Sequence, residues 1–198
     1  MLPGFVYLDE ALPGACWDSK YFGCDNFMGC PADGYTVNRI VMAQETAFAL
    51  KDAQAEFLRD GFNIFVFDAY RPARAVKDFC RWVAEGDDRR KALHFPFVNR
   101  QELISLGYIA AQSGHSRGGT VDLTLTENGQ MLDMGGIFDF MDSMSAHGAP
   151  VTPKQAQNRA YLRSVMLKNG FTDYECEWWH YRLKNEPYPD TYFDFVIE

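Results

Sequence analysis

Four side chains in two short segments have the types and spacing needed to bind a catalytic metal ion. In SGHSRGGTVDL the imidazole of His115 and the carboxylate of Asp122 have six residues between them, and EWWHY supplies Glu177 and His180. Three protein ligands of mixed nitrogen and oxygen type are typical of a catalytic zinc, which keeps its fourth position for water, whereas a structural zinc takes four. These residues therefore predict one catalytic zinc site.

Each of these residues also has a simpler interpretation when it is taken alone. A single His or Asp near glycine more often forms a turn or a hydrogen-bonded core residue than a metal site. The chain has only four histidines. The combination nevertheless favours metal binding, because both segments place polar groups among strongly apolar neighbours, and a buried unpaired charge is costly. Coordination to a metal ion removes that cost.

The elements that must position these groups can be placed along the chain. From Thr120 to Leu125 polar and apolar residues alternate, so Asp122 is expected on a strand, pointing away from the apolar layer. Capping signals and apolar periodicity predict three helices, over 37–59, from Pro72 to near Gly86, and from 152 to Gly170. Further strands are expected over 63–67, 171–174 and 178–182.

These elements are partly segregated along the chain, which indicates an α+β fold with a mainly antiparallel central sheet and helices packed against it. Arg71 and Asp122 fall at or near strand ends and His180 comes from a later strand, so they can converge on one cleft. Residues 87–100 and 126–150 are predicted to be loops that cover a small pocket. We expect all 198 residues to form one domain, since the length suits a single core and no linker or repeat is apparent.

Composition limits the partners. A formal net charge of −8 argues against nucleic acid and against an anionic membrane, because both require a basic face. No apolar run approaches the ~20 residues of a membrane span, and the first residues do not resemble a signal peptide. The five cysteines include no CxxC pair, so a disulfide framework is not expected and a reducing cytoplasm is favoured. A homodimer is compatible with the sequence, which does not fix the oligomeric state.

The motifs together resemble the VanX-type D-alanyl-D-alanine dipeptidases, zinc D,D-peptidases that share a fold with the Hedgehog signalling domain. The resemblance covers nearly the whole chain. It includes FVYLDEALPG, WDSKYFGCDNFMG, DGYTVNRI, FDAYRPARAV, GYIAAQSGHSRGGTVDLTL, MGGIFDFMD and EWWHYRLKNEPYPDTYFDF. One position departs from the family pattern, because Thr120 stands where a small alanine is usual. A second variable position is Gly114.

The resemblance implies roles for five of these residues. His115, Asp122 and His180 are the expected zinc ligands. Glu177 is the expected general base, which would take a proton from the attacking water and pass it to the departing amine. Arg71 resembles the arginine that stabilises the developing oxyanion. Its alternative is a surface arginine at the start of the helix opened by Pro72.

The resemblance also implies a substrate pocket that recognises the free amine of a dipeptide. Asp139 is the candidate for binding the substrate ammonium, aided by Ser113; its alternative is a capping residue after two glycines. Tyr21, Tyr35 and Tyr108 resemble pocket tyrosines. For these three a core position is nearly as well supported, since the chain has ten tyrosines.

Three functions follow from the sequence. The first is zinc-dependent hydrolysis of D-alanyl-D-alanine to two D-alanines, serving vancomycin resistance or D-alanine recycling. The second is a zinc D,D-carboxypeptidase or endopeptidase acting on peptidoglycan peptides, which would need an open amine side. The third is a non-catalytic, zinc-stabilised binding module. The presence of both Glu177 and Arg71 argues against the third, because zinc binding alone requires neither.

Overall fold

The computed structural model describes residues 2–198. Its helices are α1 (Leu8–Ala11), α2 (Gln44–Arg59), α3 (Ala73–Glu85), α4 (Lys91–His94) and α5 (Pro153–Lys168), with 3₁₀ turns η1 (Arg100–Glu102), η2 (Gly114–Arg117) and η3 (Ser143–Ser145). Its strands are β1 (Phe5–Tyr7), β2 (Cys16–Trp17), β3 (Val41–Ala43), β4 (Asn63–Asp68), β5 (Thr120–Glu127), β6 (Gln130–Met131), β7 (Phe171–Tyr174) and β8 (Glu177–Leu183).

The central sheet has the strand order β2-β4-β5-β8-β7, and β6 pairs with the end of β5. All of its neighbouring strands are antiparallel except β2 and β4, which run parallel. Strands β1 and β3 form a separate two-stranded antiparallel sheet. The predicted α+β fold with a mainly antiparallel sheet is therefore confirmed.

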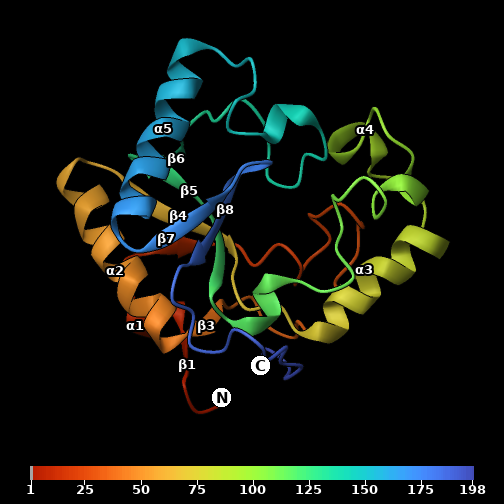
Figure 1. Ribbon diagram of the computed structural model, residues 1–198, viewed down its shortest axis with the longest axis horizontal. Helices are drawn as coiled ribbons and strands as arrows, with labels where there is room; N and C mark the ends of the chain where they lie inside the picture. Colours follow the sequence, from red (N-terminus) through yellow and green to blue (C-terminus); the bar gives the residue numbers. More distant parts are fainter. Residues whose placement is uncertain (1) are drawn as a thin grey trace.

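The sheet lies between two unlike layers (Figure 1). Helices α2 and α5 pack against each other on one side, where α2 contacts β4 and α5 contacts β7. Helix α3 and the segments around α4 lie on the other side of the molecule in this view. On β5 the apolar residues Val121, Leu123 and Leu125 belong to the main core cluster, while Asp122 and Thr124 on the opposite face are also buried. Both faces of the central strand are thus covered.

The predicted helix ends agree with local chemistry. In α5, Thr152 caps the helix in a capping box with Gln155, and Pro153 occupies the first turn. The helix stops before Gly170, whose φ of 88° is a left-handed conformation that glycine adopts without strain. The longest helices, α2 and α5, have 16 residues each. Among residues 2–198, no helix is long and apolar enough to cross a membrane.

Two expectations about the elements need correction. The helix predicted from residue 37 begins only at Gln44, because Val41–Ala43 form β3 and pair with Phe5–Tyr7 at the start of the chain. A partner so distant in sequence leaves no local signal. The predicted loops 87–100 and 126–150 also contain short regular elements, α4 in the first, and the end of β5, then β6 and η3 in the second.

Candidate metal and substrate site

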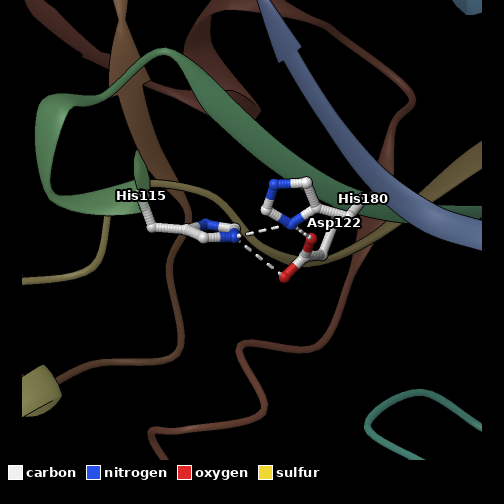
Figure 2. A group of neighbouring side chains, drawn as sticks. All are labelled: His115, Asp122 and His180. Carbon is white, nitrogen blue, oxygen red and sulfur yellow. Dashed lines mark hydrogen bonds and ion pairs between the residues drawn. The ribbon is translucent and has the colours of Figure 1, made fainter. Parts of the chain in front are cut away.

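His115, Asp122 and His180 converge at one point, each from a different element (Figure 2). The Nε2 atom of His115 lies 3.2 Å from Oδ2 of Asp122 and 3.3 Å from Nδ1 of His180, and His180 Nδ1 lies 3.1 Å from Oδ1 of Asp122. A tetrahedral centre with ligand bonds of about 2.0–2.1 Å would separate its ligands by about 3.3 Å. The spacing of these donor atoms therefore fits one zinc ion.

The tautomer of His115 supports this interpretation. Its Nδ1 lies 2.7 Å from the carbonyl oxygen of Ala69. A carbonyl only accepts hydrogen bonds, so Nδ1 carries the proton and, in the neutral ring, Nε2 presents a lone pair. That lone pair is directed at a carboxylate and a second imidazole. Asp122 Oδ1 is also buried and accepts no well-aligned hydrogen bond from residues 2–198. A cation resolves this convergence of electron-rich atoms.

The sheet fixes where the three groups meet. Asp122 on β5 is directly opposite His180 on β8 in the antiparallel register, so their side chains project from the same face. His115 lies in η2, just before β5, and Gly118 ends this turn with a φ of 78°. The backbone carbonyl of His115 accepts from the amide of Arg71, which ties η2 to the end of β4.

The charges of the three groups are interdependent. Burial alone would raise the pKa of the Asp122 carboxyl, but His115 and His180 hold it below its usual value. Burial opposes protonation of His180, and the Asp122 carboxylate 3.1 Å away outweighs that effect and raises the pKa of His180. The carboxylate is thus kept ionised, as metal binding requires.

Glu177 lies beside the three ligand atoms and is suited to proton transfer. Its Oε2 is 3.6 Å from His180 Nδ1, and its side chain is 24% exposed, enough to face the cavity. Burial, opposed by His180 and reinforced by the Asp122 charge, raises the pKa of Glu177 to about 7. A carboxyl with a pKa near neutrality can both accept and return a proton.

Arg71 is held by a buried carboxylate that the sequence analysis did not single out. Asp68, at the end of β4, accepts from Nε of Arg71 at 2.9 Å, and its other oxygen accepts from the hydroxyl of Tyr35 at 2.8 Å. The Arg71 guanidinium reaches to 3.7 Å from Asp122 and lies over the ring of Tyr21. Burial disfavours its charge, but the surrounding acidic groups raise its pKa and keep it cationic. The alternative of a surface arginine is thus not what the structure shows.

Asp139 marks the other end of the cavity. Its Oδ2 accepts from the Tyr21 hydroxyl at 2.7 Å, and its backbone carbonyl accepts from Nδ1 of His94 at 3.1 Å. Burial raises the pKa of Asp139 well above its usual value, and the Tyr21 hydrogen bond only partly offsets this. Asp139 also has a φ of 58°, a left-handed conformation that aspartate adopts uncommonly. A half-buried carboxylate that accepts one hydrogen bond from the side chains of residues 2–198 is a suitable partner for an incoming cation.

The segment that carries Asp139 is anchored by a buried arginine of α5. The guanidinium of Arg159 donates to the backbone carbonyls of Met134, Met144 and Ala146 at 2.6–2.9 Å. Its side chain is 2% exposed. These bonds hold both ends of an otherwise irregular connection, so Asp139 is placed by a clamp that acts on the backbone.

All but one of the predicted site residues line a single cavity of about 220 Å³. The lining includes His115, Asp122, His180, Glu177, Arg71, Asp139, Ser113, Tyr21 and Tyr108. The exception is Tyr35, which does not line it. Tyr35 contacts Asp68 instead, and so lies behind Arg71.

Comparison with known proteins identifies the family of this chain. The model of the Peptidase M15 family, described as D-ala-D-ala dipeptidase, matches residues 1–198. This chain belongs to that family. The D-alanyl-D-alanine dipeptidase of Enterococcus faecalis is 48% identical over 198 residues, covering 98% of each chain. The enzyme of the same name from Streptomyces coelicolor is 50% identical over 201 residues, covering 100% of both.

A mutant of the vancomycin resistance D,D-pentapeptidase VanY, solved in complex with Zn(II), is similar over 78% of each chain, with 17% identity and a TM-score of 0.45. Membership of the D-ala-D-ala dipeptidase family confirms the resemblance found in the motifs and identifies the chain as a zinc metallopeptidase.

Thr120 and Gly114, the two positions noted in the sequence for their departure from the motif or their variability, are neighbours. Thr120 is fully buried, and its hydroxyl has no hydrogen-bond partner within residues 2–198. A Cβ added at Gly114 would lie 3.1 Å from that hydroxyl. The glycine therefore leaves the space that the threonine hydroxyl occupies.

Asp68, His94 and Arg159 were missed by the sequence analysis. Asp68 did carry a signal, because a charged residue at the end of the apolar run NIFVF suggests a role at the sheet edge. His94 and Arg159 act through backbone carbonyls far away in sequence, and no local pattern reports such contacts.

Proposed function

We propose that this chain hydrolyses D-alanyl-D-alanine to two D-alanines, with one zinc ion held by His115, Asp122 and His180. The observation that carries the proposal is the pairing of two ends in one small cavity. At one end electron-rich atoms of His115, Asp122 and His180 meet, with the nearest atoms of each pair 3.1–3.3 Å apart. At the other end Asp139 offers a carboxylate for an ammonium group. A free dipeptide has its scissile carbonyl close to its ammonium and matches this arrangement.

Glu177 acts as the general base. Zinc, when bound, supplies a Lewis acid that lowers the pKa of water to about 7 and polarises a carbonyl. The Glu177 carboxylate accepts the proton that the attacking water loses and then delivers it to the departing amine. Its raised pKa, about 7, suits both transfers near neutral pH.

Arg71 stabilises the oxyanion that develops on the carbonyl oxygen. Its guanidinium is fixed before substrate arrives by two hydrogen-bonding groups, Asp68 and the Tyr21 hydroxyl, the latter 3.5 Å from Nη2. A donor that is already oriented needs no reorganisation when charge develops, and one such donor is typically worth about 3–4 kcal/mol of barrier. Tyr35 contributes by holding Asp68.

Asp139 selects substrates with a free amine. Tyr21 orients its carboxylate, and Ser113 lines the same cavity. The volume of about 220 Å³ suits a dipeptide better than a longer wall peptide. We place the enzyme in the cytoplasm, where a free dipeptide precursor of the wall is made. Its use there in vancomycin resistance or in D-alanine recycling depends on the metabolic setting.

Release of D-alanine by the zinc-loaded protein tests the proposal. D-Ala-D-Ala and an N-acylated D-Ala-D-Ala would be compared, with Glu177→Ala as the inactive variant. Glu175→Ala, which removes an exposed carboxylate two residues away, is the matched control. We expect turnover of the free dipeptide alone. Cleavage of the acylated peptide would instead indicate a carboxypeptidase, and no cleavage of either would indicate a binding module.

A further inference from the structure

An arginine stands next to the metal ligands on the same face of the sheet. In the antiparallel register of β5 and β8, Asp122 lies opposite His180, and Thr120 lies opposite Arg182. The second pair is two residues along each strand from the first, so its side chains project from the same face. Two residues of a strand span about 6.6 Å. Arg182 is therefore a neighbour of the metal ligands across the surface of the sheet.

A groove of about 270 Å³ lies over this part of the sheet. Arg182 lines it together with Thr172, which is opposite Arg182 on β7. The groove and the catalytic cavity have Gly114, Tyr174 and His180 as common lining residues. The rings of Tyr174 and His180 pack edge to face, with centroids 5.7 Å apart. The two spaces thus adjoin each other beside His180, and we call the second one the distal groove.

The distal groove contains one arginine whose charge is not neutralised. Arg117 also lines the groove, but Glu186 binds its guanidinium through two contacts of 3.0 and 2.8 Å. The carboxylate of Asp173 accepts from Arg163 at 2.7 Å. Arg182 is exposed, and its side chain forms no hydrogen bond or ion pair within residues 2–198. The groove therefore offers a net positive charge and a free guanidinium.

Asp139 lies on the opposite side of the metal ligands. It lines the catalytic cavity but not the distal groove. Its neighbour Phe138 lines a further cavity together with Thr124 and Trp178. These two strand residues are each two positions from a metal ligand, in the direction opposite to that of Arg182. The metal ligands thus lie between a carboxylate and a free guanidinium.

A dipeptide carries the complementary charges in the same order, with an ammonium at one end, a carboxylate at the other and the scissile carbonyl between them. We propose that Arg182 binds the terminal carboxylate of the dipeptide at the entrance of the distal groove. The carboxylate lies one residue, about 3.6 Å of extended chain, beyond the scissile carbonyl. The long side chain of Arg182 spans the remaining distance. This assignment rests on the proposed function and makes Arg182 a specificity-determining residue.

Substitution of Arg182 combined with removal of the substrate charge tests this contact. Arg182→Met should raise the KM of the zinc-loaded enzyme for D-Ala-D-Ala about 10-fold, the lower end for a hydrogen bond between charged groups, because the groove is open to water. The change in kcat should be small, because the contact is made equally in the ground state and the transition state. For the C-terminal amide of the dipeptide, the same substitution should change KM by less than about 2-fold, since additive effects indicate no contact.

Two further variants separate charge from packing. Arg182→Lys keeps the charge but loses the planar fork, so it should raise the KM for the dipeptide by about 3-fold only. Arg59→Met is the matched control, because Arg59 is an exposed arginine of α2 that lines neither the catalytic cavity nor the distal groove. An equal effect of Arg182→Met on the acid and the amide, or no effect on either, would overturn the proposal.

Calorimetric titration separates this inference from the proposed function. D-Ala-D-Ala would be titrated into zinc-loaded Glu177→Gln, with and without Arg182→Met, so that binding is measured without turnover. We expect the second substitution to weaken binding about 10-fold at unchanged zinc content. If the parent enzyme released no D-alanine, the proposed function would fail while this titration still reported on Arg182. Equal affinity of the two proteins, or no saturable binding to either, would refute the role of Arg182 whatever the activity.

Discussion

The two ends of the catalytic cavity are built in different ways. At the metal end, Asp122 and His180 face each other across paired strands, so the register of the sheet fixes their separation. At the amine end, Asp139 sits in an irregular segment that is held from outside by Arg159 and His94. Of the groups assigned to bond cleavage, Asp122, Glu177 and His180 thus lie on paired strands of the central sheet. The group assigned to substrate choice lies between β6 and η3, outside the strands.

This difference predicts that damage at the two ends will have different kinetic signatures. Changes at the metal end should abolish metal binding or lower kcat, because those groups act on the reacting atoms. Changes at the amine end should raise KM and leave the metal in place. A substitution at the metal end that raised KM without changing kcat or metal content would contradict this difference between the two ends.

The largest effect is expected from His180→Ala, which removes one of three zinc ligands. We expect loss of stoichiometric zinc and of dipeptidase activity together, measured by metal analysis of the purified protein and by D-alanine release. His147→Ala is the matched control, because His147 lies outside the cavity lining. Stoichiometric zinc in His180→Ala would remove this residue from the ligand set.

Glu177→Gln should lower kcat by roughly 10²–10⁴-fold, the usual contribution of a general base. Zinc content and KM should stay close to those of the parent enzyme, because the amide has nearly the same size and shape as the carboxyl. Steady-state kinetics together with metal analysis would check this. Near-normal kcat in a zinc-loaded variant would show that another group accepts the proton.

Asp139→Asn should act on KM and on stability in opposite directions. Loss of a charge-assisted hydrogen bond predicts a rise in KM of about 10- to 100-fold, equivalent to about 1.5–3 kcal/mol. The pKa of Asp139 is raised on folding, so its ionised form destabilises the folded protein, and the neutral amide should raise Tm by a few degrees.

The gain in Tm expected for Asp139→Asn over the parent depends on pH. The contribution of a group whose pKa is raised on folding is present below its unfolded pKa and is lost as the pH rises through the folded value. The Tm difference between Asp139→Asn and the parent should therefore be largest at neutral pH and disappear toward about pH 4, where both side chains are neutral. Thermal unfolding across this range, with Asp142→Asn as control, tests it. A Tm difference that does not change with pH would contradict the assignment.

Tyr35→Phe should lower kcat by about 5-fold, the effect of one lost hydrogen bond to Asp68, and leave KM unchanged. This variant tests the difference between the two ends of the cavity. Tyr35 was expected to contact the substrate, but its hydroxyl donates to Asp68, which holds Arg71. Tyr161→Phe, which removes a hydroxyl bonded to Asp60, is a matched change outside the site. A rise in KM for Tyr35→Phe would restore its role as a pocket residue.

The smallest effect concerns the Gly114 and Thr120 pair. Gly114→Ala should destabilise the protein by about 1 kcal/mol, because the added methyl meets the threonine hydroxyl at 3.1 Å. In a Thr120→Ala background the same change should be neutral or slightly stabilising. A double-mutant cycle by chemical denaturation measures this coupling. Equal effects in both backgrounds would show that the two residues are independent.

Local patterns predicted those parts of the molecule that local chemistry determines. Alternation in TVDLTL placed Asp122 on a strand, and the Thr152 and Pro153 signals placed the start of α5. The start of α2 was wrong because Val41–Ala43 pair with a strand near the beginning of the chain. Arg159 was missed for the same reason, since its partners are set by tertiary packing. Asp68 was missed although it ends the apolar run NIFVF and lies three residues before Arg71. The resemblance of the motifs indicated which residues surround the cavity. The structure then showed which hydrogen bonds and ion pairs connect them.

The clamp formed by Arg159 holds its segment through main-chain atoms. Within residues 2–198 the Arg159 guanidinium hydrogen-bonds three main-chain carbonyls of the segment and none of its side chains. These three hydrogen bonds therefore do not depend on the side chains that the segment carries. Substitutions around position 139 would thus leave the attachment of this segment to α5 in place. Two of the three proposed metal ligands, Asp122 and His180, are instead tied to the strand register, so a shift of one strand past the other would move them apart.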